Sequence, residues 1–105
     1  MPEFLVELYV SHDDHQTAHR HAERAQRATA ELTREGQPLR CVRSIFVPQD
    51  ETCFVLYEAP SAAVVAEALR RAGLRHEHIS AASSSGALPP SEGARTSTSP
   101  RKAPP

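Results

Sequence analysis

Residues 39–58 read LRCVRSIFVPQDETCFVLYE, two runs rich in β-branched and aromatic residues around a short polar loop. The first run covers residues 39–47, the second covers residues 52–58, and four residues, 48–51, connect them. A loop of this length between two such runs is typical of a β-hairpin. The centre of the chain is therefore predicted to be a pair of antiparallel strands.

Alternation along this hairpin, with Val47 opposite Thr52, predicts two unlike faces. The residues of the first face are Val42, Ser44, Phe46, Cys53, Val55 and Tyr57. The residues of the second face are Cys41, Arg43, Ile45, Val47, Thr52, Phe54, Leu56 and Glu58. The second face mixes charged and apolar side chains, but it is too apolar to be left in water.

The segments outside the hairpin predict one strand and one helix on each side of it. Residues 3–10 alternate between an apolar set (Phe4, Val6, Leu8 and Val10) and a mixed set (Glu3, Leu5, Glu7 and Tyr9), which predicts a strand. Residues 14–34 contain neither Gly nor Pro and are predicted to be a helix, with a narrow buried stripe of Ala18, Ala22, Ala25, Thr29 and Leu32. Pro60 and Gly73 are predicted to bound a second helix, and residues 77–82 a last strand.

The resulting order, β-α-β-β-α-β, predicts an α+β fold of the ferredoxin-like type, with an antiparallel sheet and two helices on one of its faces. Two helices cover only one face of such a sheet. The opposite face would carry the mixed residues described above, and a second copy of the chain is the simplest cover for it. We therefore expect a homodimer of the dimeric α/β-barrel type, with the two sheets packed face to face.

The 105 residues divide into two parts of different composition. Residues 1–82 are predicted to form the ferredoxin-like domain, with a net charge of −3, and residues 83–105 a disordered Ser/Pro-rich tail, with a net charge of +2. The overall charge of −1 disfavours nucleic acid and membrane surfaces as partners. Without a signal sequence or an apolar run long enough to span a membrane, the chain is expected to be cytoplasmic.

Histidines provide the first candidate site. Helical spacing places His12, His15, His19 and Glu23 on one side of the first helix. Imidazoles one turn apart, with a carboxylate as a further ligand, can hold nickel, zinc or another divalent metal. The alternative is a solvated helix face, and no motif indicates an organic cofactor.

A second candidate site comprises Glu7, Tyr9, Arg43 and Glu58, which lie on the mixed face of the predicted sheet. One interpretation is an ion pair from Arg43 to Glu7 or Glu58 at the dimer interface. The other is a small pocket between the sheets, in which the carboxylates bind a cation or act as a base.

The two cysteines are the third group. The hairpin register predicts Cys41 and Cys53 on different strands and opposite faces, which excludes a disulfide without rearrangement. Both are therefore expected to be reduced thiols of the core.

The run SIFVPQDETCFVLYEAPS, residues 44–61, continues to Ala72-Gly73-Leu74 and, with Phe4-Leu5-Val6-Glu7, resembles a family of small bacterial proteins often described as nickel-binding. The resemblance covers about residues 2–81 and implies a dimer-forming ferredoxin-like fold that binds nickel. The chain departs from the family pattern at Cys41 and Arg43, where many relatives carry an aromatic residue and a His, and at Arg75, where they usually carry Pro.

Three functions remain as hypotheses. The first is a small binding protein whose ligand is nickel or another divalent metal. The second is an enzyme of the dimeric α/β-barrel kind that acts on a small molecule. The third is an accessory protein that binds a partner and no small ligand.

Overall fold

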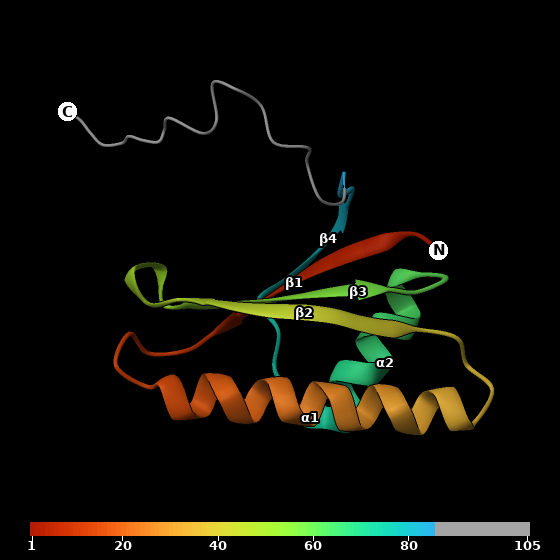
Figure 1. The fold of residues 1–105 in the computed structure, drawn as a ribbon, viewed down its shortest axis with the longest axis horizontal. Coiled ribbons are helices and arrows are strands. Elements are labelled where there is room, and N and C mark those ends of the chain that lie inside the picture. The colour runs from red at the N-terminus through yellow and green to blue at the C-terminus, as the bar shows by residue number, and fades with distance from the viewer. Residues whose placement is uncertain (86–105) are drawn as a thin grey trace, which may run out of the picture.

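The computed structural model describes residues 1–85 and confirms the predicted β-α-β-β-α-β order (Figure 1). Within these residues the elements are β1 (Glu3–Tyr9), α1 (His15–Arg34), β2 (Arg40–Val47), β3 (Thr52–Glu58), α2 (Ala62–Ala72) and β4 (His78–Ala82). Residues 86–105 of the predicted tail lie outside the described part of the chain.

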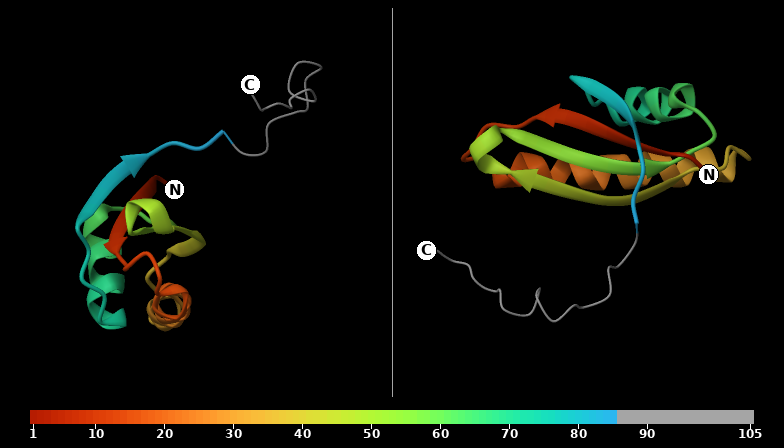
Figure 2. Two further views of the ribbon diagram at one scale, coloured as in Figure 1. Left: turned by 90° about the vertical axis from the view of Figure 1, so that its left-hand side faces the viewer. Right: turned by 90° about the horizontal axis from the view of Figure 1, so that it is seen from above.

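The four strands form one antiparallel sheet in the order β2-β3-β1-β4. Both helices lie on the same side of this sheet, as Figures 1 and 2 show, so within residues 1–85 no helix covers the other side. We call this uncovered side the open face. The fold is therefore the ferredoxin-like arrangement expected from the sequence.

Side-chain caps set where both helices begin. Asp14 accepts a hydrogen bond from the backbone N–H of Thr17 at 3.0 Å and another from its hydroxyl at 2.6 Å, so α1 starts at His15. Ser61 caps α2 in the same way, and for this reason α2 begins at Ala62 and not at Pro60 as expected. Gly73 ends α2 in the left-handed conformation, with φ of 71°.

The core lies between the sheet and the helices. It combines Val6, Leu8 and Val55 of the sheet with small residues of α1 and with Val65 and Leu69 of α2. The buried residues of α1 are Ala18, Ala25, Ala28, Thr29 and Leu32. Ala22, which the sequence placed in this stripe, is only half-buried, and the helix buries Ala28 in addition.

The predicted position of Cys41 is wrong. A β-bulge between Cys41 and Arg43 shifts the register, so Cys41 lies opposite Tyr57 and faces the core. Cys53 also faces the core, but it lies opposite Phe46, at the far end of the hairpin from Cys41. Both cysteines are free, and burial raises the pKa of the Cys41 thiol to about 11 and raises that of Cys53 as well. The prediction of reduced core thiols therefore agrees with the structure, although the assumed face of Cys41 does not.

Within residues 1–85, no helix combines the length and the apolar character that crossing a membrane requires.

Candidate functional site

Cross-strand pairing arranges the side chains of the open face in rows that run across the sheet. The pairs β3–β1 and β1–β4 are in continuous register, and the β2–β3 pair is continuous except at the bulge between Cys41 and Arg43. In strand order the rows are Arg40-Glu58-Glu3-Ala82, Arg43-Leu56-Leu5-Ser80, Ile45-Phe54-Glu7-His78 and Val47-Thr52-Tyr9. Apolar residues thus occupy the middle of the face, and most of the charged residues surround them.

A broad hollow of about 880 Å³ lies over the first two rows. Its lining residues are Glu3, Arg40, Val42, Arg43, Ile45, Leu56, Glu58, Ser84 and Ser85. The segment that follows β4 crosses the sheet on this side, as the right-hand view of Figure 2 shows. Ser84 holds it there by donating hydrogen bonds from its N–H, at 2.8 Å, and its hydroxyl, at 2.7 Å, to the Glu3 carboxylate. The hollow is therefore bounded at one end by the chain's own segment.

The ion pair at this end of the face differs from the predicted one. Arg40 Nε donates to Glu58 Oε1 at 3.0 Å, and this contact lowers the pKa of Glu58. Arg43, which was expected to pair with Glu7 or Glu58, is exposed and forms no ion pair with any of residues 1–85. Arg43 thus presents a free positive charge beside apolar Leu56.

The four candidates Glu7, Tyr9, Arg43 and Glu58 all belong to the open face, but they do not converge on one point. Glu58 and Tyr9 lie in the first and last rows, which the strand rise places about 20 Å apart. Glu7 faces His78 directly across β1 and β4. Ile79, the next residue of β4, packs against the core, so His78 lies on the open face.

The histidine candidates are divided between two places. His12 precedes α1 and contacts the hairpin loop: its N–H donates to Glu51 Oε2 at 3.0 Å, and its Nδ1 lies 3.1 Å from the same oxygen. The Glu51 contact raises the pKa of His12. His19 Nε2 lies 3.5 Å from Glu23 Oε2, and the ring of His15 meets Phe46 edge-on with 5.1 Å between the centroids.

These positions bear on the predicted metal site. Among residues 1–85, no group of three or more His, Cys, Asp or Glu side chains is placed to hold a metal ion. His15 and His19 nevertheless line one cavity of about 240 Å³ between α1 and the hairpin, together with Ser44, Phe46 and Cys53. The structure thus brings two of the four expected ligands to one cavity and places His12 in a separate contact.

A third polar feature joins the two helices on the opposite side of the molecule. Arg71 of α2 donates to Glu31 Oε1 at 3.0 Å and to Glu35 Oε2 at 2.6 Å on α1, and to Glu67 Oε2 at 2.9 Å on its own helix. Arg70 also binds Glu67, at 2.6 Å. Arg70 and Arg71 lower the pKa of Glu67 to about 2, and Arg71 lowers that of Glu35.

The Arg71 contacts predict how stability depends on pH. Because the pKa values of Glu35 and Glu67 are lowered by folding, their contribution is complete above about pH 4.5 and is lost as pH falls towards about 2. The variant Arg71→Met is expected to be less stable at neutral pH and to lose less stability over this acid range. Thermal unfolding measured across the range checks this prediction.

Arg70→Met is the matched control, because it removes the Arg70 contact to Glu67 and keeps the bridge between the helices. Its acid dependence is expected to lie between those of the natural protein and Arg71→Met. Since the arginines and carboxylates of this cluster are at least partly exposed, high salt should reduce the differences in stability between the variants. Identical acid profiles for the natural protein and Arg71→Met would contradict the assignment.

Comparison with known proteins returned no match. No family model, no curated protein and no solved structure matches the chain. The function proposed for the chain therefore rests on the geometry of its own residues.

Proposed function

We propose that the chain is a small-molecule-binding protein that works as a homodimer, with the open faces of two copies packed against each other around the ligand. The observation that carries this proposal is the open face itself: an apolar centre with a hollow of about 880 Å³ and a free guanidinium at its side. Ile45 is 51% exposed and Tyr9 is 58% exposed in the single chain, which is costly for side chains of this size.

The arrangement on the open face indicates the class of ligand. Leu5 and Leu56 lie side by side in the Arg43 row, so an apolar group can rest on them while an anionic group reaches Arg43. Arg40 is less available because it is paired with Glu58. We therefore favour an amphipathic ligand that carries one anionic group.

The anionic dye anilinonaphthalene sulfonate combines these two chemical features and tests the ligand class. We expect saturable binding with increased fluorescence, and about tenfold weaker binding in the variant Arg43→Gln, which loses the free charge and keeps most of the side chain. Fluorescence titration of the full chain measures both.

Arg34→Gln is the control, since Arg34 is exposed at the end of α1, away from the open face. Its affinity for the dye should match that of the natural protein. Equal weakening in the two variants would mean that the dye responds only to overall charge, and absence of saturable binding would exclude the proposed ligand class.

Metal binding is the second candidate function, favoured by the cavity that His15 and His19 share. The two imidazoles are one helical turn apart, so a divalent ion such as nickel would have two nitrogen donors there, and Glu23, 3.5 Å from His19, would have to turn towards the ion to add a carboxylate. His12 is not part of this set, because it is bound to Glu51.

Calorimetric titration with nickel tests this candidate. Saturable binding is expected in the natural protein and in His12→Ala, and it should be lost in the double variant His15→Ala, His19→Ala. Loss in His12→Ala as well would favour the four-residue site expected from the sequence. Unchanged binding in the double variant, or no binding at all, would exclude the helix site.

The proposal includes a cytoplasmic location, which the two free thiols of Cys41 and Cys53 support. The enzyme hypothesis would gain support from a dimer that closes a cavity over Glu7 and His78, which face each other on the open face. A dimer interface filled by side chains, with no room for a ligand, would instead favour an accessory protein.

A further inference from the structure

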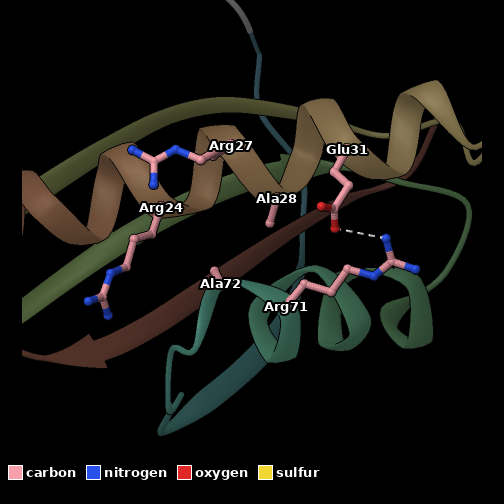
Figure 3. Close-up of a pocket in the computed structure, with 6 residues that line it drawn as sticks. All are labelled: Arg24, Arg27, Ala28, Glu31, Arg71 and Ala72. Atoms are coloured by element: carbon pink, nitrogen blue, oxygen red, sulfur yellow. Dashed lines mark hydrogen bonds and ion pairs between the residues drawn. The ribbon is translucent and has the colours of Figure 1, made fainter.

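A small pocket lies between α1 and α2, on the side of the molecule away from the open face (Figure 3). Its volume is about 190 Å³, below the range usual for drug-sized ligands. The lining residues are Arg24, Arg27, Ala28, Glu31, Arg71 and Ala72. We call it the arginine pocket, because three of these six side chains carry a guanidinium group.

Arg27 has no carboxylate partner within the described chain, although two carboxylates stand at helical spacing from it. Glu23, four residues before, contacts His19 at 3.5 Å, and Glu31, four residues after, accepts from Arg71 at 3.0 Å. No ion pair within residues 1–85 involves Arg27. Its guanidinium therefore remains available to a ligand.

Arg24 is also without an ion pair to any described residue. The positions three and four residues away include Arg20 and Arg27 and no acid, so helical spacing supplies no carboxylate partner for Arg24. His21, packed beside it, has a lowered pKa, first because of burial and then because of Arg24 and Arg20. Positive potential thus accumulates along this part of α1.

The fourth charged group of the lining, Glu31, is the one negative charge, and Arg71 engages it. In Figure 3 the Glu31 side chain points towards Arg71, while Arg24 and Arg27 extend from the neighbouring turns of α1. Ala28 and Ala72 have short side chains, which leave space between the arginines. The uncompensated positive charge of the lining therefore lies on Arg24 and Arg27, beside a hollow of about 190 Å³.

We propose that the arginine pocket is a binding site for a phosphate group, held by the guanidinium groups of Arg24 and Arg27, while Arg71, whose charge three carboxylates offset, forms the facing wall. Planar guanidinium groups present paired N–H donors that match phosphate oxygens, which is why arginine is the usual residue at such sites. The volume of about 190 Å³ is several times the roughly 30 Å³ of a water molecule, so the pocket has room for a phosphate group and a small part of its ester.

Calorimetric titration of the full chain with inorganic phosphate, and separately with phenyl phosphate, tests the proposal. Saturable binding is expected for both, and the double variant Arg24→Gln, Arg27→Gln should bind at least about tenfold more weakly. Neither residue is buried or paired, so the variant should keep the circular dichroism spectrum and unfolding temperature of the natural protein.

The matched control is Arg34→Gln, Arg75→Gln, which removes the same charge from exposed positions outside the pocket. Its affinity should stay within about twofold of the natural protein. Equal weakening in both double variants would overturn the proposal, because it would show an effect of net charge alone. Absence of saturable binding in the natural protein would overturn it as well.

Discussion

Replacement of Ile45 by lysine is expected to convert the proposed homodimer into a monomer. Ile45 lies on β2, an edge strand of the sheet, and belongs to the open face. The residue is 51% exposed in the single chain. A second copy would bury this side chain together with Leu5, Phe54 and Leu56. A lysine there places a charge in a desolvated interface, where an unpaired charge is strongly destabilising.

The dimer mass is the direct measurement. Light scattering of the natural protein at micromolar concentration should give twice the chain mass of 11.5 kDa, and Ile45→Lys should give the single mass. Ala30→Lys is the control, since Ala30 is an exposed apolar residue on α1, away from the open face. A natural protein that is monomeric at this concentration would exclude the face-to-face dimer and with it the proposed binding mode.

Size makes this dimer physically reasonable. The structure describes 85 residues, and a domain of this size buries only roughly 60–65% of the surface of its unfolded chain. Specific interfaces bury at least about 1,000 Å² in total, and a four-stranded face is large enough to supply that area. Pairing of the open faces would therefore both protect the apolar residues and add to a limited core.

Tyr57→Ala is expected to destabilise the fold by about 3–5 kcal/mol, the largest effect that we expect from a core substitution. Tyr57 is fully buried on β3, between the strands that carry Phe4 and Cys41. Truncation to alanine leaves a cavity that the surrounding sheet and helices cannot fill. Since small domains are stable by only about 5–15 kcal/mol, much of the stability would be lost.

Tyr57→Phe separates the ring from the hydroxyl. The Tyr57 hydroxyl and that of Thr29 are both buried, and neither forms a hydrogen bond of good geometry with a described residue, although they lie near enough for Thr29 to lower the pKa of Tyr57 somewhat. Burial outweighs this effect and raises the pKa, which keeps the phenol neutral. Removing an unpartnered hydroxyl eliminates its desolvation cost, so Tyr57→Phe should stabilise the protein by about 1 kcal/mol.

Urea unfolding of the two Tyr57 variants and the natural protein, at one protein concentration, measures how each substitution changes the free energy of unfolding. The two substitutions are expected to change the free energy of unfolding in opposite directions. A loss of more than about 1 kcal/mol in Tyr57→Phe would instead show that the hydroxyl forms a stabilising hydrogen bond in solution.

Most of the fold could be predicted from local patterns. The pairing of Val47 with Thr52 was predicted from the length of the loop and the alternation of apolar residues, and the structure has that pair. Helix α2 begins two residues after the predicted Pro60, because the Ser61 side chain caps the helix. The face of Cys41 was missed because a bulge reverses alternation without changing the composition of the strand.

The candidate site was predicted less completely. Alternation placed Arg43 and Glu58 on the same face. The residue that forms the ion pair with Glu58 is Arg40, because the bulge decides which residue of β2 lies opposite Glu58. The contact of His12 with Glu51 joins residues 39 positions apart and depends on where the hairpin loop meets the start of α1. Neither contact leaves a signal in local spacing.

The sequence by itself determined the order of the elements, the apolar face of each and the presence of an open sheet face, because these follow from periodicities of two and 3.6 residues within single segments. The tertiary structure alone decided which charges are paired and which are free. Arg71 binds three carboxylates while Arg43, Arg24 and Arg27 bind none of the described ones. Such a distribution depends on distances between segments remote in sequence, since an ion pair forms only where the fold brings two side chains within about 4 Å.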